Sequence, residues 1–457
     1  MPTKSTDGLI LKSNIIITYC YNEIRRNFFM SNKEKGITLI ALIITIIVML
    51  ILVGVVVTVV IQSDLLGTAK TAGDKYKTAY EDESNMSEVT INGEKYASID
   101  DYIESTKPLP EIKAGERASE KSKYQTAVIP KGFTVSNATG EKDVSTGLVI
   151  YDIPENELEN VKWDGTEKTK YNQFVWIPVE VNKETDTETE IASFYRSKWS
   201  NNARITGLEP YYNEPIAMDN EAGITSQIEK LIKSIYKYSG FYIGRYEAGS
   251  KTERTSSSGV TPIGIKQDMY PYNYVKWGES MSEIGTEGAV YLSNNLYNSS
   301  DYGATSMLCT GACWDSMLDF IKDEEHNVSN SASWGNYSDA EFEITRGRYA
   351  ESVRGTLGSF TAVVGTYNKE LESVSNKNIL LTTGASERNS AKNIYDVAGN
   401  CFEWTTESSY NRARVMRGGD FSNDGSYSSY PANFRYGYGP TDDSLVFGFR
   451  PILYVNI

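Results

Sequence analysis

The stretch NIYDVAGNCFEWT, residues 393–405, decides the fold of the C-terminal part of this 457-residue chain. Its Gly399 can adopt a positive φ and lets other backbone segments approach closely. Phe402 and Trp404 are large apolar side chains that we expect in a core. The stretch therefore predicts a glycine-containing loop that leads into a buried segment.

Five further motifs stand around this stretch in a fixed order. The first two are typical of buried strands, and the third has apolar residues at the spacing of an amphipathic helix. The motifs are FVWIPVE (174–180), FYIGRYEAG (241–249), CWDSMLDFIKD (313–323), RVMRGGDF (414–421) and FGFRPIL (447–453). The series resembles the formylglycine-generating enzyme, or sulfatase-modifying factor, domain. The resemblance implies an α+β, C-type-lectin-like fold of small antiparallel sheets and irregular loops.

The resemblance also implies residues that a catalyst of this type would need. The oxidases of the family bind copper through a cysteine pair shortly after the RGG motif, but this chain has no cysteine beyond Cys401. A thiolate both binds the metal and exchanges with the substrate thiol. Related iron enzymes use a histidine cluster, and His326 is the single histidine here. We therefore expect no enzyme activity, with a divergent metal-dependent oxidoreductase as the alternative.

A structural calcium ion is a further implication of the resemblance. The matching positions are Asp396 and Glu403 by side chain, and Gly399 and Cys401 by backbone carbonyl. Oxygen ligands in a glycine-containing loop suit calcium. The alternative is that the two carboxylates only accept backbone N–H bonds within the loop.

The composition of the chain argues against nucleic acid as a partner and against a zinc site. The chain has 45 basic and 60 acidic residues, a formal net charge of −15, and no basic stripe, which argues against nucleic acid. Cys309, Cys313 and His326 superficially resemble a zinc-binding spacing, but no second histidine follows. We expect the two cysteines to line a buried helix instead.

An apolar segment dominates the N-terminal part. Residues 37–61 contain 25 consecutive positions without a charge, which as a helix would span ~38 Å, more than a bilayer core needs. Lys33 and Lys35 precede it. The pattern predicts a single transmembrane helix, with the N-terminus in the cytoplasm and the C-terminal domain outside the cell.

The junction KEKG|ITLIALIITII resembles a type IV prepilin or pseudopilin leader. It implies cleavage by a prepilin peptidase after Gly36, methylation of Ile37, and pilin-like subunits as partners. The family usually has glutamate at the fifth mature position, where this chain has Ala41. Met30 is an alternative start for a leader of the usual length.

These patterns divide the chain into four parts. We expect a leader at 1–36, a transmembrane helix with an amphipathic stem at 37–85, a linker and small β-rich region at 86–170, and the lectin-like domain at 171–457. The sequence TINGEK, residues 90–95, predicts a hairpin with a two-residue turn.

The segment between residues 422 and 446 is rich in tyrosine, serine, asparagine and glycine. This is the composition of antibody paratopes, and it also resembles the variable proteins of diversity-generating retroelements. The expected ligand contacts are Asn423, Tyr427, Tyr430, Asn433, Tyr436 and Tyr438. The leading hypothesis is a surface protein that binds an extracellular protein or glycan, with tyrosines that do not hold the fold. A minor pilin subunit, or an ordinary tyrosine-rich loop, are the alternatives.

Overall fold

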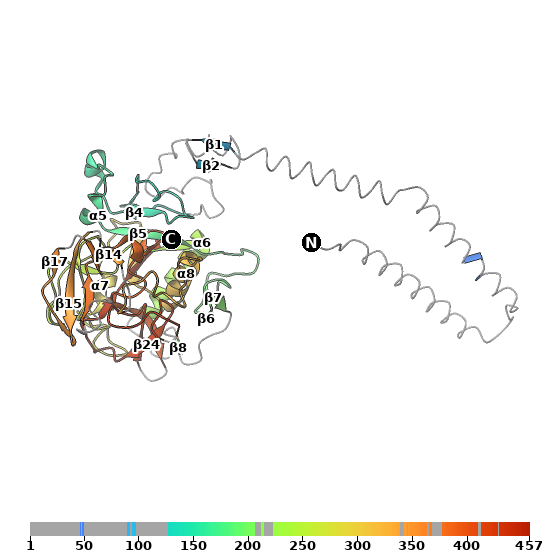
Figure 1. The fold of residues 1–457 in the computed structure, drawn as a ribbon. Coiled ribbons are helices and arrows are strands. Elements are labelled where there is room, and N and C mark those ends of the chain that lie inside the picture. The colour runs from blue at the N-terminus through green and yellow to red at the C-terminus, as the bar shows by residue number, and fades with distance from the viewer. Residues whose placement is uncertain are drawn as a thin grey trace. The chain divides into compact units, whose positions relative to one another are not determined.

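The computed structural model divides the chain into two units, Met1–Pro108 and Leu109–Ile457 (Figure 1). The described residues of the first unit are three helical positions, Ile46, Val48 and Met49, and a hairpin of β1 (Val89–Ile91) and β2 (Glu94–Tyr96). The antiparallel pairing of Ile91 with Glu94 confirms the hairpin predicted from TINGEK. In the second unit the described residues are 127–205, 212–213, 223–338, 342–344, 346–362, 365–367, 377–409, 413–427 and 429–457.

The predicted fold class, α+β with a long transmembrane helix, is wrong for the described residues. They are largely β with few helices, because residues with strand and turn preferences separate the few amphipathic stretches. No helix in these ranges has the length and apolar character needed to cross a membrane. The predicted span at 37–61 lies outside the described residues, apart from the three helical positions.

A six-stranded antiparallel sheet forms one half of the second unit. Its strand order is β13-β26-β9-β5-β4-β3. The strands are β3 (Thr134–Val135), β4 (Val149–Tyr151), β5 (Gln173–Pro178), β9 (Gly240–Gly244), β13 (Ala304–Leu308) and β26 (Pro451–Val455). The motifs at 174–180 and 241–249 thus supply neighbouring central strands.

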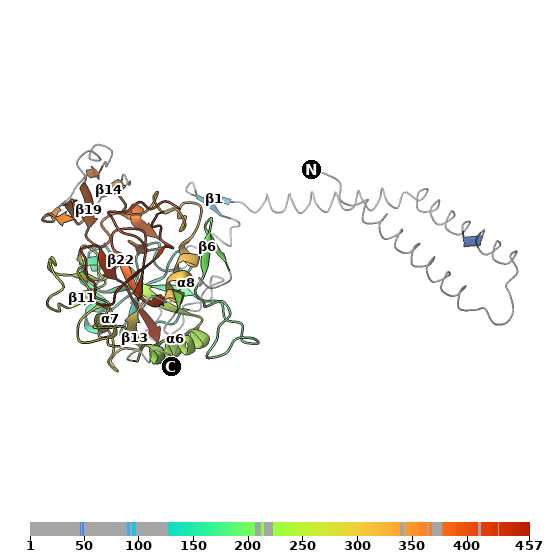
Figure 2. The same cartoon turned by 90° about the horizontal axis from the view of Figure 1, so that it is seen from below.

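Helices pack against this sheet, namely α6 (Ile224–Tyr238), α7 (Ala289–Asn294) and α8 (Gly311–Ile321). The short helix α5 (Glu167–Lys170) leads into β5. Figure 2 shows α6 beside β13 and the end of the chain. The helix predicted from the motif at 313–323 is α8, and Thr310 caps it by accepting the Cys313 N–H at 3.0 Å.

A second sheet contains the strands that lie between residues 402 and 449, together with β8. Its order is β24-β23-β22-β25, and β8 pairs with β22. The strands are β8 (Tyr212–Asn213), β22 (Phe402–Ser409), β23 (Ala413–Arg417), β24 (Arg435–Tyr438) and β25 (Phe447–Phe449). β25 runs parallel to β22, whereas the other pairs are antiparallel.

Smaller elements fill the periphery. They are η1 (Glu155–Asn160), β6 (Lys198–Ser200), β7 (Ala203–Ile205), β10 (Gly249–Ser250), β11 (Ile263–Gly264), β12 (Tyr270–Pro271), β14 (Phe342–Ile344), β15 (Arg348–Val353), β16 (Thr356–Leu357), β17 (Thr361–Ala362), β18 (Gly365–Tyr367), β19 (Lys377–Leu381), η4 (Glu387–Asn389), β20 (Ser390–Ala391) and β21 (Ile394–Tyr395). Figure 2 shows β14 and β19 projecting from one side of the second unit.

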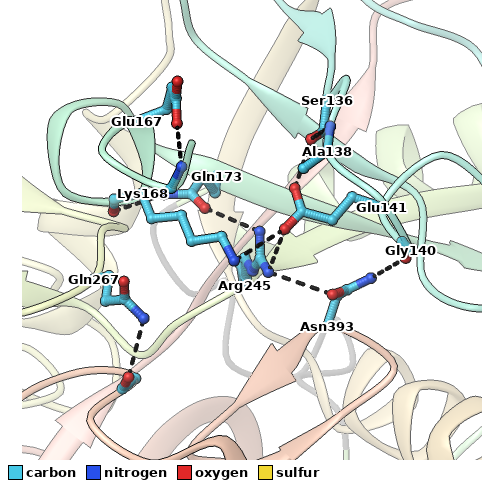
Figure 3. A network of polar contacts seen from close by, with 12 residues as sticks. Ser136, Ala138, Gly140, Glu141, Glu167, Lys168, Gln173, Arg245, Gln267 and Asn393 are labelled. Atoms are coloured by element: carbon cyan, nitrogen blue, oxygen red, sulfur yellow. Dashed lines mark hydrogen bonds and ion pairs between the residues drawn. The ribbon is translucent and has the colours of Figure 1, made fainter. Parts of the chain in front are cut away.

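Residues 127–170 contribute to the same sheet as the motifs, through β3 and β4. A buried ion pair holds this region in place: Arg245, at the end of β9, lies 2.8 Å from Glu141, and Asn393 donates to Gly140 O at 2.8 Å (Figure 3). Burial opposes ionisation of Glu141, but Arg245, Ser136 and Lys168 outweigh it and hold its pKa at about 2. The domain therefore begins well before residue 171.

Two apolar cores lie on the faces of the sheets. Trp176 and Trp404 are fully buried in one, and Trp314 on α8 in the other. The indole N–H of Trp404 donates to Val275 O, and that of Trp314 donates to Ala432 O. The prediction that Phe402 and Trp404 lie in a core is confirmed.

Candidate functional site

Strand β24 gives the tyrosine-rich segment two distinct faces. Side chains alternate along a strand, so Arg435 points to one face and Tyr436 and Tyr438 to the other. Arg435 is buried, whereas both tyrosines are half-buried. Pairing of β24 with β23 places Tyr436 opposite Met416, which lies in the core.

The face of β24 that Tyr436 shares with Met416 of β23 carries a row of aromatic rings at the margin of the core. Tyr430, Phe434, Tyr436 and Tyr438, here called the aromatic surface, are all half-buried. Neighbouring ring centroids are 4.6 Å apart for Tyr430 and Phe434, 6.1 Å for Phe434 and Tyr436, and 5.0 Å for Tyr436 and Tyr438. Such spacings are those of favourable aromatic pairs. The result is a continuous aromatic strip at the edge of the second sheet.

Core residues support this strip from below. Phe402 lies 5.8 Å from Tyr430 and 6.1 Å from Tyr436 between ring centroids, and Phe447 lies 4.6 Å from Tyr438. Both phenylalanines are buried. The rings of the aromatic surface therefore pack against the core and are partly exposed.

The opposite face of β24 rests on a buried group of charges. Asp315, Glu407, Arg417 and Arg435, here called the ion cluster, come from α8, β22, β23 and β24. Asp315 binds Arg417 at 2.8 Å and Arg435 at 2.6 Å, and Arg435 also binds Glu407 at 2.7 Å.

Electrostatics within the ion cluster favour the charged forms. Burial raises the pKa of Asp315, but Arg435, Arg417 and the Ser197 N–H outweigh it and bring the pKa to about 2. The ion pairs that hold the Arg435 side chain also restrain the backbone of β24, because the side chain is attached to that strand. The ion cluster thus positions the aromatic surface on the other face of the strand.

The loop before β24 is also anchored. The Asp420 side chain accepts the Ser422 N–H at 2.7 Å, and the Tyr337 hydroxyl donates to Gly418 O at 2.8 Å. Asn433 donates from its side chain to the Ser329 hydroxyl at 2.9 Å, and Asn423 donates to Asp420. Hydrogen bonds of this kind give a loop without regular structure a defined shape.

A cavity of about 500 Å³ opens at the end of the aromatic surface. Its lining residues are Tyr438, Thr441, Asp442, Asp443, Ser444, Val446 and Phe447. The walls combine two aromatic rings with hydroxyl and carboxylate groups, a composition suited to binding a small polar group.

The six expected ligand contacts divide into three kinds. Tyr427 is 54% exposed, and its hydroxyl accepts a hydrogen bond from Asn327. Tyr430, Tyr436 and Tyr438 lie together in the aromatic surface and pack against the core. The expectation that these tyrosines play no part in the fold is therefore wrong for the last three. Asn423 and Asn433 hold the loop through the hydrogen bonds described above.

Sequence reasoning missed residues at this site. Phe402 was expected in the core, and Phe447 lies in the motif at 447–453. Both are buried, and their rings also support the tyrosines. The cavity residues Asp442 and Asp443 follow the strand and had no distinguishing pattern. The alternation in RYGY was the available signal, since it places the tyrosines on one face.

The motif at 393–405 forms a tight loop around Gly399. This residue has φ +74°, and a Cβ there would lie 2.0 Å from Asn336 O, so only glycine fits. Both oxygens of Glu403 accept from Arg450, at 2.6 and 2.9 Å. Asp396 accepts the Gly384 N–H at 2.7 Å through one oxygen.

Excess negative charge is buried next to this loop. Asp396, Glu403 and Glu247 face the single guanidinium of Arg450, and Asp396 Oδ1 and Glu247 Oε2 have no hydrogen-bond partner. Burial raises the pKa of all three carboxyls, that of Asp396 to about 7. A proton or a cation would relieve this charge.

The fit to calcium is partial. Asp396 retains a free carboxylate oxygen, but Arg450 takes both oxygens of Glu403. Within the described ranges, no group of three or more His, Cys, Asp or Glu side chains is arranged to hold a metal ion. A calcium ion would therefore rely on Asp396 and on backbone carbonyls such as those of Gly399 and Cys401.

Calcium binding by this loop stays a prediction. We expect calcium to raise the melting temperature of the full-length chain by several degrees over a chelator, since a ligand at 100 times its Kd adds ~2.7 kcal/mol. Differential scanning calorimetry with and without calcium measures this. An Asp396→Asn control should lose the difference, and identical curves for the wild-type chain would contradict the prediction.

The cysteines lie where the helix interpretation puts them. Cys309 and Cys313 are buried in the core beside Trp314, and Cys401 is buried beside Phe421. His326 lies outside this core, where its ring contacts Asp323 at 2.8 Å and Ser390 O at 3.0 Å. The prediction that the cysteines line a buried helix is confirmed for Cys313, which lies in α8, whereas Cys309 is buried just before the residue that caps this helix.

Comparisons with known proteins agree with the sequence motifs over part of the chain. Residues 312–454 match the model of the sulfatase-modifying factor enzyme 1-like domain family. No curated protein matches the chain. A solved structure, Treponema denticola variable protein 1, matches with 14% identity over 47% of this chain and 85% of that chain, at a TM-score of 0.25.

Proposed function

We propose that the second unit is a non-catalytic ligand-binding domain whose ligand contacts the aromatic surface, Tyr427 and the adjoining cavity. The observation that carries the proposal is the construction of β24. One face holds buried charges that fix the strand, and the other presents half-buried rings to solvent. A partly exposed aromatic strip with rigid support is what recognition sites use.

The chemistry of these groups suits binding rather than turnover. Tyrosine offers a large contact area with only two side-chain torsions to fix, so little entropy is lost on binding. The cavity adds Asp442 and Asp443 as hydrogen-bond acceptors. The cysteines described are buried in cores, and burial raises the pKa of Cys401, which disfavours the reactive thiolate.

We further propose that the ligand is an extracellular protein or glycan. The support comes from the sequence: a basic leader, an apolar segment and an acidic C-terminal region favour a domain outside the cell, held at the membrane surface. The composition of residues 422–446 supports a segment that varies between related copies.

Exposed Tyr427 offers a test of binding that leaves the fold intact. The free energy of unfolding of a full-length Tyr427→Ala chain should lie within about 0.5 kcal/mol of the wild-type value, because the ring packs little. This variant should bind more weakly than wild type to glycan arrays or to intact cells, which serve as the probes in this experiment. The control is Tyr291→Ala on α7, a tyrosine that belongs neither to the aromatic surface nor to the cavity lining. Equal binding by the Tyr427 variant and wild type would remove this residue from the site.

The leader junction makes a separate prediction. Cleavage after Gly36 should give a mature chain that begins at Ile37, with a methylated amine, when the gene is expressed with a prepilin peptidase. Mass spectrometry of the N-terminal peptide measures this, and a Gly36→Val chain should stay uncut. A wild-type chain that retains Met1 or Met30 would contradict the prediction.

A further inference from the structure

A second cavity, of about 340 Å³, shares no lining residue with the one beside Tyr438. It is formed by the end of β5, the C-terminal half of α8 and the turn between β20 and β21. Its charged lining residues are Glu180, Arg204, Asp319, Lys322 and Lys392. Three are basic and two acidic, in a protein whose net charge is −15.

Most of these charges already neutralise one another. Asp319 pairs with Arg204 at 3.4 Å and with Lys322. Glu180 is exposed at its position after β5. Lys392 differs, because no acidic side chain in the described part of the chain forms an ion pair with it.

Lys392 is held by neutral groups alone. Its Nζ donates to Phe320 O at 2.7 Å and lies 4.4 Å from the centroid of the Phe320 ring. Burial lowers the pKa of Lys392, since the ammonium group has lost part of its water shell; Asp323 opposes this from a distance. An anion in the cavity would replace the lost solvation.

The backbone of Lys392 is unusual for a lysine. Lys392 and Asn393 have φ of +45° and +65°, and they join β20 to β21 in a two-residue turn. Such turns favour asparagine or glycine, because a positive φ is unfavourable for most side chains. A lysine at the first position of the turn incurs this strain. Such strain is typical of residues whose side chains have a functional role.

Ser316 supplies an unused hydrogen-bond donor in the same cavity. The residue lies on α8 and is 6% exposed. Its buried hydroxyl has no hydrogen-bond partner, which is rare for a buried polar group in a folded protein. Ser145 and Ser193 add two more hydroxyl-bearing residues to the lining.

We propose that this cavity binds a compact oxyanion, a carboxylate or phosphate group, between the ammonium group of Lys392 and the hydroxyl of Ser316. The cation supplies charge and the hydroxyl a directed hydrogen bond, the pair that oxyanions require. Carboxylates occur on acidic sugars and proteins and phosphates on nucleotides and lipids, so the shared group is what the site recognises.

Calorimetric titration of the full-length chain with inorganic phosphate, and separately with acetate, tests the proposal at constant ionic strength. We expect saturable binding of at least one probe, and the stronger one identifies the class of anion. Lys392→Asn should weaken it at least tenfold. Because asparagine suits the turn, this variant should melt at or above the wild-type temperature, so lost binding cannot reflect unfolding.

Two further variants complete the test. Ser316→Ala removes a hydroxyl that has no partner, so it should leave melting unchanged and weaken binding several-fold. Lys183→Met removes an equal charge from a lysine that contacts Tyr236 and does not line the cavity, and this variant should bind like wild type. Absence of saturable binding to both probes, or equal binding by Lys392→Asn and wild type, would overturn the proposal.

Discussion

Replacing Arg450 by methionine should cost the second unit at least about 3–5 kcal/mol of unfolding free energy, the usual result of removing one partner of a buried ion pair. Arg450 is fully buried and donates to Glu403, Gly244 O and Tyr395 O. Its removal would leave three buried carboxyls without a cation. Urea unfolding followed by tryptophan fluorescence measures the loss.

A double variant separates charge from packing. Arg450→Met with Glu403→Gln removes both members of the pair and should recover part of the lost stability, because no unpaired charge remains at that pair. Arg354→Met is the control for a surface arginine, since this residue is exposed on the turn after β15. A single Arg450→Met variant as stable as this control would refute the account of the pair.

An Asp315→Asn chain should lose about 2 kcal/mol at neutral pH, with a clear pH dependence. The folded pKa is about 2, against 3.8 for the unfolded group. A depressed carboxyl pKa stabilises the folded state above the unfolded value, and this stabilisation disappears as pH falls towards the folded value. Wild type and variant should therefore converge between about pH 4 and pH 2.

Unfolding curves at several pH values test this directly. Asp164→Asn provides the control, because Asp164 lies on the surface and its pKa is lowered by hydrogen bonds from Thr166 rather than by buried arginines. A difference between Asp315→Asn and wild type that stays constant down to pH 2 would show that the ion cluster does not hold the charged form of Asp315.

Local patterns in the sequence predicted local structure well. The apolar spacing after Thr310 predicted α8, and the hydrophobic motifs at 174–180 and 241–249 predicted β5 and β9. These predictions succeeded because such elements depend on residues close in sequence. Residues 127–170 were placed in a separate region, yet β3 and β4 join the main sheet. Contacts between residues far apart in the sequence, such as the ion pair of Glu141 and Arg245, leave no local pattern.

The same reason explains why the candidate site could be predicted only in part. Alternation in RYGY was visible in the sequence, but the partners of its residues were not. Asp315 lies 120 residues before Arg435, and Phe402 reaches the tyrosines from another strand. Membership in the core could therefore be assigned for Phe402 and Trp404, whereas the partial burial of Tyr430, Tyr436 and Tyr438 depends on three-dimensional packing.

The central claim is that the aromatic surface binds a ligand, and the dissociation constant of a Tyr438→Ala chain tests it most directly. Tyr438 lies both in the aromatic surface and in the wall of the cavity. For the glycan or cell surface that binds wild type best, we expect at least a roughly 30-fold weaker Kd, the loss typical of a central aromatic contact, and no change for Tyr291→Ala. Equal Kd values for wild type and Tyr438→Ala, at matched folded fractions, would contradict the claim.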